Sequence, residues 1–130
     1  MRNIFLFLLM SYFAYGTCNL TPEQKKTVIE VQQNCLKKTG ATAEMVLDAF
    51  AGKFTDAPEF KKQLVCVKME QGVIDEAGAY HKDILKEHML KLLPDEAAID
   101  SMLEKCYVVQ EDLEQTAYDM IKCFHKVKSS

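Results

Sequence analysis

Arginine is almost absent from this chain. Arg2 is the single arginine among 130 residues, lysine supplies the other positive charges, and the formal net charge is −3. Proteins that hold nucleic acids do so through clusters of positively charged side chains on the phosphates. The composition therefore excludes nucleic acid as the expected partner.

Sequence motifs of catalysis and metal binding are also missing. The sequence contains no Gly-x-Ser-x-Gly turn and no glycine-rich phosphate loop, which are typical of hydrolases and nucleotide-binding enzymes. It has no Cys-x-x-Cys pair, and His81, His88 and His125 lie apart from the cysteines, so the ligand spacing of a zinc site is not met. We therefore expect a protein that is not an enzyme and has no cofactor or metal.

Only one long hydrophobic run is present, and it lies at the start of the chain. Arg2 is followed by the apolar run 4–13 and then by small residues, which is the layout of a secretory signal peptide. The run is too short for a membrane-spanning helix, which needs about 20 residues. We expect residues 1–16 to be a signal peptide, with cleavage after residue 16 or as late as residue 18, and residues 17–130 to be one secreted, extracellular domain.

Secretion changes the expected role of the cysteines. In an oxidising compartment Cys35, Cys66, Cys106 and Cys123 form an even set that predicts two disulfides. Four cysteines can be paired in three ways. Cys18 is left without an intramolecular partner if it survives cleavage.

Helix start and stop signals divide the mature sequence into six segments. Apolar residues recur at helical spacing in each segment, and none shows the alternation of a strand. Capping residues or prolines open the segments, and glycines close the first three. The expected helices are 21–40, 42–52, 56–72, 80–91, 94–106 and a last one that starts at 112. The fold class is therefore all-α, with a loop over 73–79.

This pattern resembles the insect odorant-binding proteins, which include the pheromone-binding proteins. A signal peptide, a mature domain of this length, six helices and the cysteine spacing carry the resemblance. Six-cysteine members place the second and third cysteines four apart, and the fifth and sixth nine apart. The cysteines found here, Cys35, Cys66, Cys106 and Cys123, match the first, third, fourth and sixth positions.

The two missing cysteines belong to one bridge of that family. Lys62 stands at the second cysteine position and Glu114 at the fifth, so the chain is similar to the four-cysteine Minus-C group. The gap from Cys106 to Glu114 is slightly tighter than the family usually shows. Lys62 and Glu114 are expected to face each other, either as an ion pair or as two solvated side chains.

The resemblance implies the remaining two family pairings, Cys35–Cys66 and Cys106–Cys123. It also implies a compact six-helix domain around an internal hydrophobic cavity. Apolar residues on the inner helix faces are the candidate wall, and methionines among them suit irregular spaces. The candidate ligand-binding residues are Leu64, Val67, Met69, Ile84, His88, Met89, Met102, Leu113, Ala117, Met120, Ile121 and Phe124. Each apolar candidate is also compatible with plain helical core, and His88 with a hydrogen-bonded core histidine.

The function that the resemblance implies is transport of a small hydrophobic molecule, such as an odorant or pheromone. The carrier would cross an aqueous extracellular fluid, such as sensillar lymph, and release its ligand at an olfactory receptor or a membrane. The chain itself is expected to be a monomer or a weak homodimer. The alternative is a secreted helical effector, salivary, venom or cytokine-like, that acts through its surface.

Overall fold

Helices account for most of the chain in the computed structural model, which describes residues 21–129. The expected signal peptide, its cleavage position and Cys18 lie outside the described residues. The described elements are α2 (Pro22–Thr39), α3 (Ala43–Phe50), α4 (Pro58–Glu70), α5 (Lys82–Leu92), α6 (Glu96–Cys106) and α7 (Leu113–Ser129). This confirms the predicted all-α class and the six helices. None of the described helices combines the length and the apolar character needed to cross a membrane.

Local capping sets most of the helix boundaries. The Thr21 hydroxyl accepts a hydrogen bond from the backbone N–H of Gln24 (3.1 Å), and the Gln24 side-chain oxygen accepts one from the Thr21 N–H (2.9 Å). This reciprocal pair satisfies two amide donors that a helix start leaves free. The start of α4 differs from the expectation, because Ala57 occupies the capping position without a side-chain bond and Pro58 is the first helical residue.

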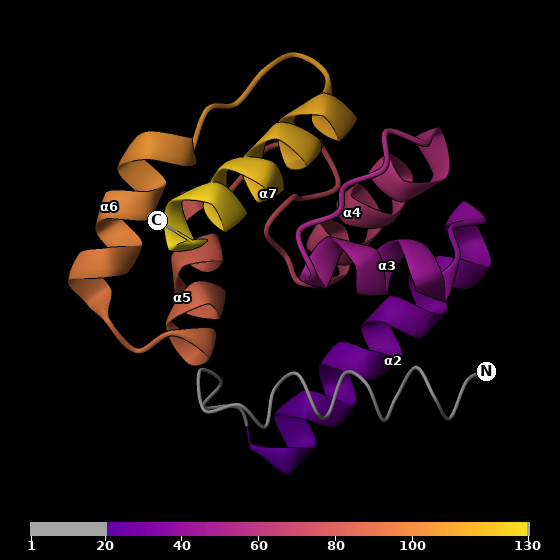
Figure 1. The fold of residues 1–130 in the computed structure, drawn as a ribbon, viewed down its shortest axis with the longest axis horizontal. Coiled ribbons are helices and arrows are strands. Elements are labelled where there is room, and N and C mark those ends of the chain that lie inside the picture. The colour runs from indigo at the N-terminus through magenta and orange to yellow at the C-terminus, as the bar shows by residue number, and fades with distance from the viewer. Residues whose placement is uncertain (1–20, 130) are drawn as a thin grey trace.

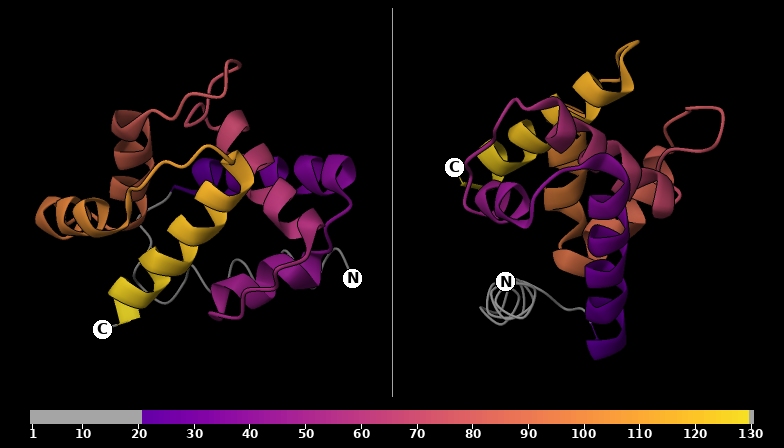
Figure 2. Two further views of the ribbon diagram at one scale, coloured as in Figure 1. Left: turned by 90° about the horizontal axis from the view of Figure 1, so that it is seen from above. Right: turned by 90° about the vertical axis from the view of Figure 1, so that its right-hand side faces the viewer.

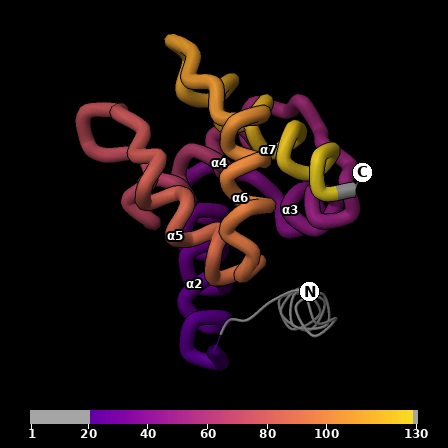
Figure 3. The backbone as a smooth tube through the Cα atoms, turned by 90° about the vertical axis from the view of Figure 1, so that its left-hand side faces the viewer, coloured from indigo at the N-terminus to yellow at the C-terminus, as the bar shows by residue number. Residues whose placement is uncertain are grey.

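The segment between α4 and α5 also differs slightly from the expected loop. Ile74 and Tyr80 form an isolated antiparallel bridge, so α5 begins at Lys82 instead of Tyr80. The Asp75 carboxylate closes the segment through a 2.9 Å contact with His81 Nε2. Figures 2 and 3 show this segment projecting from the helical body.

Helix α7 is the central element of the fold. It packs against α4 on one side and α6 on the other, while α2 packs against α4 and α5 against α6. Figure 1 and the left view of Figure 2 show α7, in yellow, running between these two groups of helices. Residues on α7 are therefore placed to contact both halves of the molecule.

Two disulfides join helices that already pack together. Cys35–Cys66 links α2 to α4, and Cys106–Cys123 links α6 to α7, which confirms both predicted pairings. Bridges that close loops of these lengths are expected to contribute about 3–4 kcal/mol each on a loop-entropy estimate. Such bridges are a large part of the stability of a small domain, which is about 5–15 kcal/mol.

A buried amide supports the first of these junctions. Gln63 of α4 is 1% exposed. Its Nε2 donates to the backbone oxygen (3.1 Å) and the side-chain oxygen (2.9 Å) of Gln32 on α2. Its Oε1 accepts from the Thr39 hydroxyl (2.9 Å). Because a buried polar group without partners is costly, this set of bonds fixes how α4 sits on α2.

The contact between α4 and α7 does not use the expected ion pair. Lys62 is exposed, and among the described residues it forms no ion pair with Glu114. Lys61 makes the contact instead: its Nζ donates to the Gln115 side-chain oxygen (3.3 Å) and lies 4.8 Å from the centre of the Tyr118 ring. The ion-pair alternative is therefore wrong.

The apolar interior is divided into three clusters. The first, between α5, α6 and α7, contains Leu85, Met102 and Met120 among its buried members. The second joins α2 to α3 around Val46, and the third joins α3, α4 and α7 around Ala49, Phe60 and Tyr118. Residues from all three clusters line one pocket.

Candidate functional site

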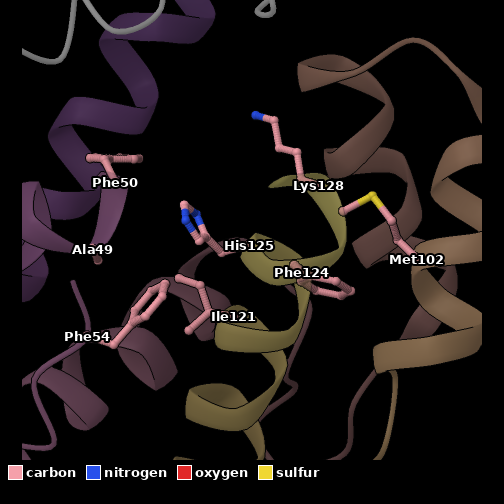
Figure 4. A pocket seen from close by; sticks show the side chains of 8 residues that line it. All are labelled: Ala49, Phe50, Phe54, Met102, Ile121, Phe124, His125 and Lys128. Atoms are coloured by element: carbon pink, nitrogen blue, oxygen red, sulfur yellow. The ribbon is translucent and has the colours of Figure 1, made fainter. Parts of the chain in front are cut away.

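A partly open pocket lies where the three apolar clusters approach one another. It encloses about 160 Å³, and its wall is mostly apolar. Figure 4 shows side chains from opposite sides of the molecule converging on it. The lining residues are Ala49, Phe50, Phe54, Met102, Ile121, Phe124, His125 and Lys128.

Helix α7 supplies half of this wall. Ile121, Phe124, His125 and Lys128 follow the spacing i, i+3, i+4 and i+7, which places four side chains on one face of a helix. Ile121 and Phe124 come first along the helix and His125 and Lys128 later, so the wall changes from apolar to basic toward the helix end. Figure 4 shows His125 and Lys128 extending from α7 toward the same side of the pocket.

The end of α3 and the segment after it form the opposite wall. Ala49 and Phe50 close α3, and the chain turns back at Gly52, whose φ is +85°. This turn places Phe54 edge-on to His125, with ring centres 5.6 Å apart. The backbone oxygen of Phe54 accepts a hydrogen bond from the Tyr118 hydroxyl (3.3 Å). The aromatic wall is thus held from α7.

The His125 ring lies directly against the backbone of Gly52. A Cβ atom at residue 52 would overlap this ring. Glycine is required here for two reasons, since the turn also needs a positive φ that other residues rarely adopt. The close packing fixes His125 as part of the wall.

The third side of the pocket comes from α6. Met102 is 8% exposed and belongs to both the pocket wall and the cluster between α5, α6 and α7. It precedes Cys106 by one helical turn. The Cys106–Cys123 bridge therefore holds Met102 opposite the α7 residues.

The ionisable residues of the pocket lining are basic. His125 and Lys128 are the two ionisable residues in the lining, and the lining contains no carboxylate. Lys128 is exposed and forms no ion pair with any residue that the structure describes. Within residues 21–129, no three His, Cys, Asp or Glu side chains gather in a group that could hold a metal ion.

Three of the twelve candidate ligand-binding residues line this pocket: Met102, Ile121 and Phe124. Met120, Ile84 and Met89 belong instead to the cluster between α5, α6 and α7. Leu64 packs in the cluster around Phe60 and Tyr118. The structure therefore distributes the apolar candidates between pocket wall and core.

The other candidates lie outside the pocket lining. Ala117 is fully buried, Val67 is half-buried on α4, and Met69 is 44% exposed. Leu113 begins α7, and its backbone oxygen accepts a hydrogen bond from the Tyr80 hydroxyl (3.3 Å). The Nε2 atom of His88 lies 3.1 Å from the backbone oxygen of Gln71. Because that partner is a carbonyl, the ring nitrogen is the donor.

The sequence-based candidate set did not include five residues of this wall. His125 and Lys128 could have been found from their helical spacing to Ile121 and Phe124. Ala49 and Phe50 lie at the end of α3, and Phe54 reaches the pocket only through the turn at Gly52. That long-range placement has no periodic signal in the sequence.

Comparisons with known proteins agree with this architecture. The sequence model of the PBP/GOBP family matches residues 18–127. The B2 protein of Tenebrio molitor is 28% identical over 109 residues, covering 84% of this chain and 85% of its own length. General odorant-binding protein 69a of Drosophila melanogaster is 28% identical over 130 residues, covering 94% of this chain and 84% of its own length.

A solved structure shares the fold. It is Odorant Binding Protein 7 from Anopheles gambiae, which has four disulfide bridges and was determined in complex with an azo compound. The match has a TM-score of 0.65 and 26% sequence identity, and it covers 85% of this chain and 89% of that chain. That protein thus combines the same helical fold with a bound small molecule.

Proposed function

The chain belongs to the PBP/GOBP family, and from this we propose that it is an extracellular carrier of a small hydrophobic ligand. Binding, and not catalysis, is the activity that this family membership supports. The apolar pocket between α3, α6 and α7 is the site that we assign to the ligand.

The observation that carries the proposal is an apolar pocket placed between separate core clusters. The Cys106–Cys123 disulfide joins α6 to α7, two of the helices that line it. Covalent bridges let a small domain keep a space that side-chain packing alone would tend to fill. A ligand in that space would replace the contacts that a continuous core makes elsewhere.

The size of the pocket limits the ligand. Its 160 Å³ is below the roughly 300–1,000 Å³ of sites for drug-sized molecules. A small ligand is therefore the expected occupant, and a larger probe would extend beyond the open side of the pocket. A buried methylene gains about 0.8 kcal/mol. An eight-carbon chain therefore gains at most about 6 kcal/mol, which corresponds to a dissociation constant of roughly tens of micromolar.

The transport role extends this binding function. Residues 1–16 direct the chain to extracellular fluid, where the ligand is shielded from water and then released at a receptor or a membrane. The carrier acts as a monomer or weak homodimer. The signal-peptide pattern supports the extracellular location, and the family membership supports the carrier role.

Displacement of a fluorescent probe tests the assignment. N-phenyl-1-naphthylamine should bind the mature domain at one site and be displaced by octanol. Ile121→Trp, which fills the pocket, should weaken probe binding about tenfold or more, because the buried contact area is lost. Met69→Trp adds the same side chain at an exposed position and should leave binding unchanged.

Two results would contradict the proposal. Wild-type protein that binds neither probe nor octanol would favour a surface-acting effector. An Ile121→Trp protein that retains its melting temperature and full affinity would place the ligand elsewhere. Circular dichroism separates loss of binding from loss of folding.

A further inference from the structure

The basic end of the pocket narrows the class of ligand. The lining runs from Met102, Ile121 and Phe124 to His125 and Lys128, and it contains no acidic residue. A purely apolar ligand would use only the first part of this wall. The positive charge of Lys128, with no carboxylate in the lining, indicates that the ligand has a polar head of opposite sign.

We propose that the ligand is a short amphiphile with an anionic head, of the medium-chain carboxylate class. The head lies at Lys128, beside His125, and the tail lies among Met102, Ile121 and Phe124. This inference rests on the proposed carrier function and names the substrate class of the same site.

The position of Lys128 suits such a head group. Its side chain is exposed and has no ion-pair partner in the described part of the chain, so its ammonium is available to a ligand. A flexible four-carbon stem lets the charge follow the head group. Because the contact lies at the solvent edge, the carboxylate keeps part of its hydration and avoids the full cost of burying a charge.

His125 adds a fixed polar group beside that mobile charge. Packing against Gly52 and the edge of Phe54 holds its ring in the wall. A ring N–H can donate to a carboxylate oxygen. The C-terminal end of α7 carries a partial negative charge that opposes an anion, but this is about half an elementary charge and smaller than that of the ammonium.

Three ligands with one tail separate charge from hydrophobic binding. Octanoate, octanol and octylamine are compared by probe displacement at pH 7.5, where the carboxylate is ionised. Lys128→Met should weaken octanoate about 3- to 10-fold, as expected for loss of a partly exposed charged contact. The same variant should change octanol affinity less than twofold. Lys128→Glu should weaken octanoate further and strengthen octylamine.

Lys126→Met is the matched control. Lys126 is exposed in the same last turn of α7 but does not line the pocket, so its loss should leave octanoate affinity unchanged. Raising the salt concentration should weaken octanoate binding and leave octanol binding unaltered, because salt screens exposed charges.

The failures of the two proposals are distinguishable. If octanol displaces the probe but Lys128→Met leaves octanoate affinity unchanged, the anionic head is refuted and the carrier function remains. Equal weakening by Lys126→Met and Lys128→Met would also refute it, since a general charge effect would then explain the binding. If none of the three ligands displaces the probe, the carrier function itself is refuted.

Discussion

Replacing Lys68 by methionine should stabilise the protein at neutral pH. Lys68 lies in the last turn of α4 and is half-buried. Its ammonium forms no hydrogen bond or ion pair with any described residue. Loss of hydration on burial lowers the pKa of Lys68 from 10.5 to about 8. The folded protein therefore disfavours the charged form of this side chain.

The pKa shift sets the magnitude of the effect. One pKa unit corresponds to about 1.4 kcal/mol, so the shift represents at most about 3.5 kcal/mol of destabilisation. Because the side chain keeps some contact with water, we expect Lys68→Met to raise the free energy of unfolding by about 1–2 kcal/mol at pH 7.

The gain should depend on pH with a defined sign. Below about pH 8 both folded and unfolded chains hold the proton on Lys68, and the full penalty applies. Between pH 8 and 10.5 the folded chain releases the proton while the unfolded chain keeps it, so wild-type stability rises relative to the variant. At pH 10 the advantage of Lys68→Met should fall to less than half its value at pH 7.

Urea denaturation at pH 7 and pH 10, with the disulfides intact, measures the stability gain of Lys68→Met and its decrease at high pH. Lys62→Met removes an exposed lysine from the same helix and should change the free energy of unfolding by less than about 0.5 kcal/mol. The reasoning is refuted if Lys68→Met is no more stable than wild type at pH 7. It is equally refuted if the gain is the same at both pH values.

Three further substitutions test the packing around the site. Gly52→Ala should lower the free energy of unfolding by about 1–2 kcal/mol in urea and weaken probe binding, since φ is +85° there and the new Cβ would displace His125. Gln63→Leu should cost about 1–3 kcal/mol in the same assay, because its hydrogen-bond partners lose their bonds. The double change Lys62→Cys and Glu114→Cys should form a third bridge, seen by mass spectrometry, and add at most about 4 kcal/mol.

Each of these changes has its own control or contradictory result. Gly72 also has a positive φ, +77°, but lies in open space, so Gly72→Ala should show only the smaller, conformational part of the stability loss and no loss of binding. A Gln63→Leu protein as stable as wild type would show that the amide contributes nothing to the α2–α4 junction. Free thiols in the double cysteine variant, or no rise in melting temperature on oxidation, would contradict the placement of residues 62 and 114 at the missing bridge.

The helices were predictable because their signals are local. Thr21 and Gln24 cap α2 through side chains three residues apart, and such bonds depend on neighbours in sequence. The isolated bridge between Ile74 and Tyr80, which delays the start of α5, depends on a turn closed by Asp75 and His81 and was not predicted.

The pocket was predictable only in part. The spacing of Ile121 and Phe124 placed them on the inner face of the last helix, and both line the wall. Met120 shares that amphipathic pattern but contributes to the core. Periodicity indicates which face is buried but not whether the neighbour is a side chain or a ligand. Phe54 lies in no helix, and the turn at Gly52 that positions it is a tertiary feature.

The Cys106–Cys123 bridge should make one wall of the pocket stiffer than the opposite wall. The stiffer wall contains Met102 of α6 and Ile121 of α7, and the disulfide links these two helices. The opposite wall is the end of α3, which includes Phe50, and α3 contains no cysteine. Ligands of different width should therefore be accommodated by displacement of α3, while the wall formed by α6 and α7 keeps its shape.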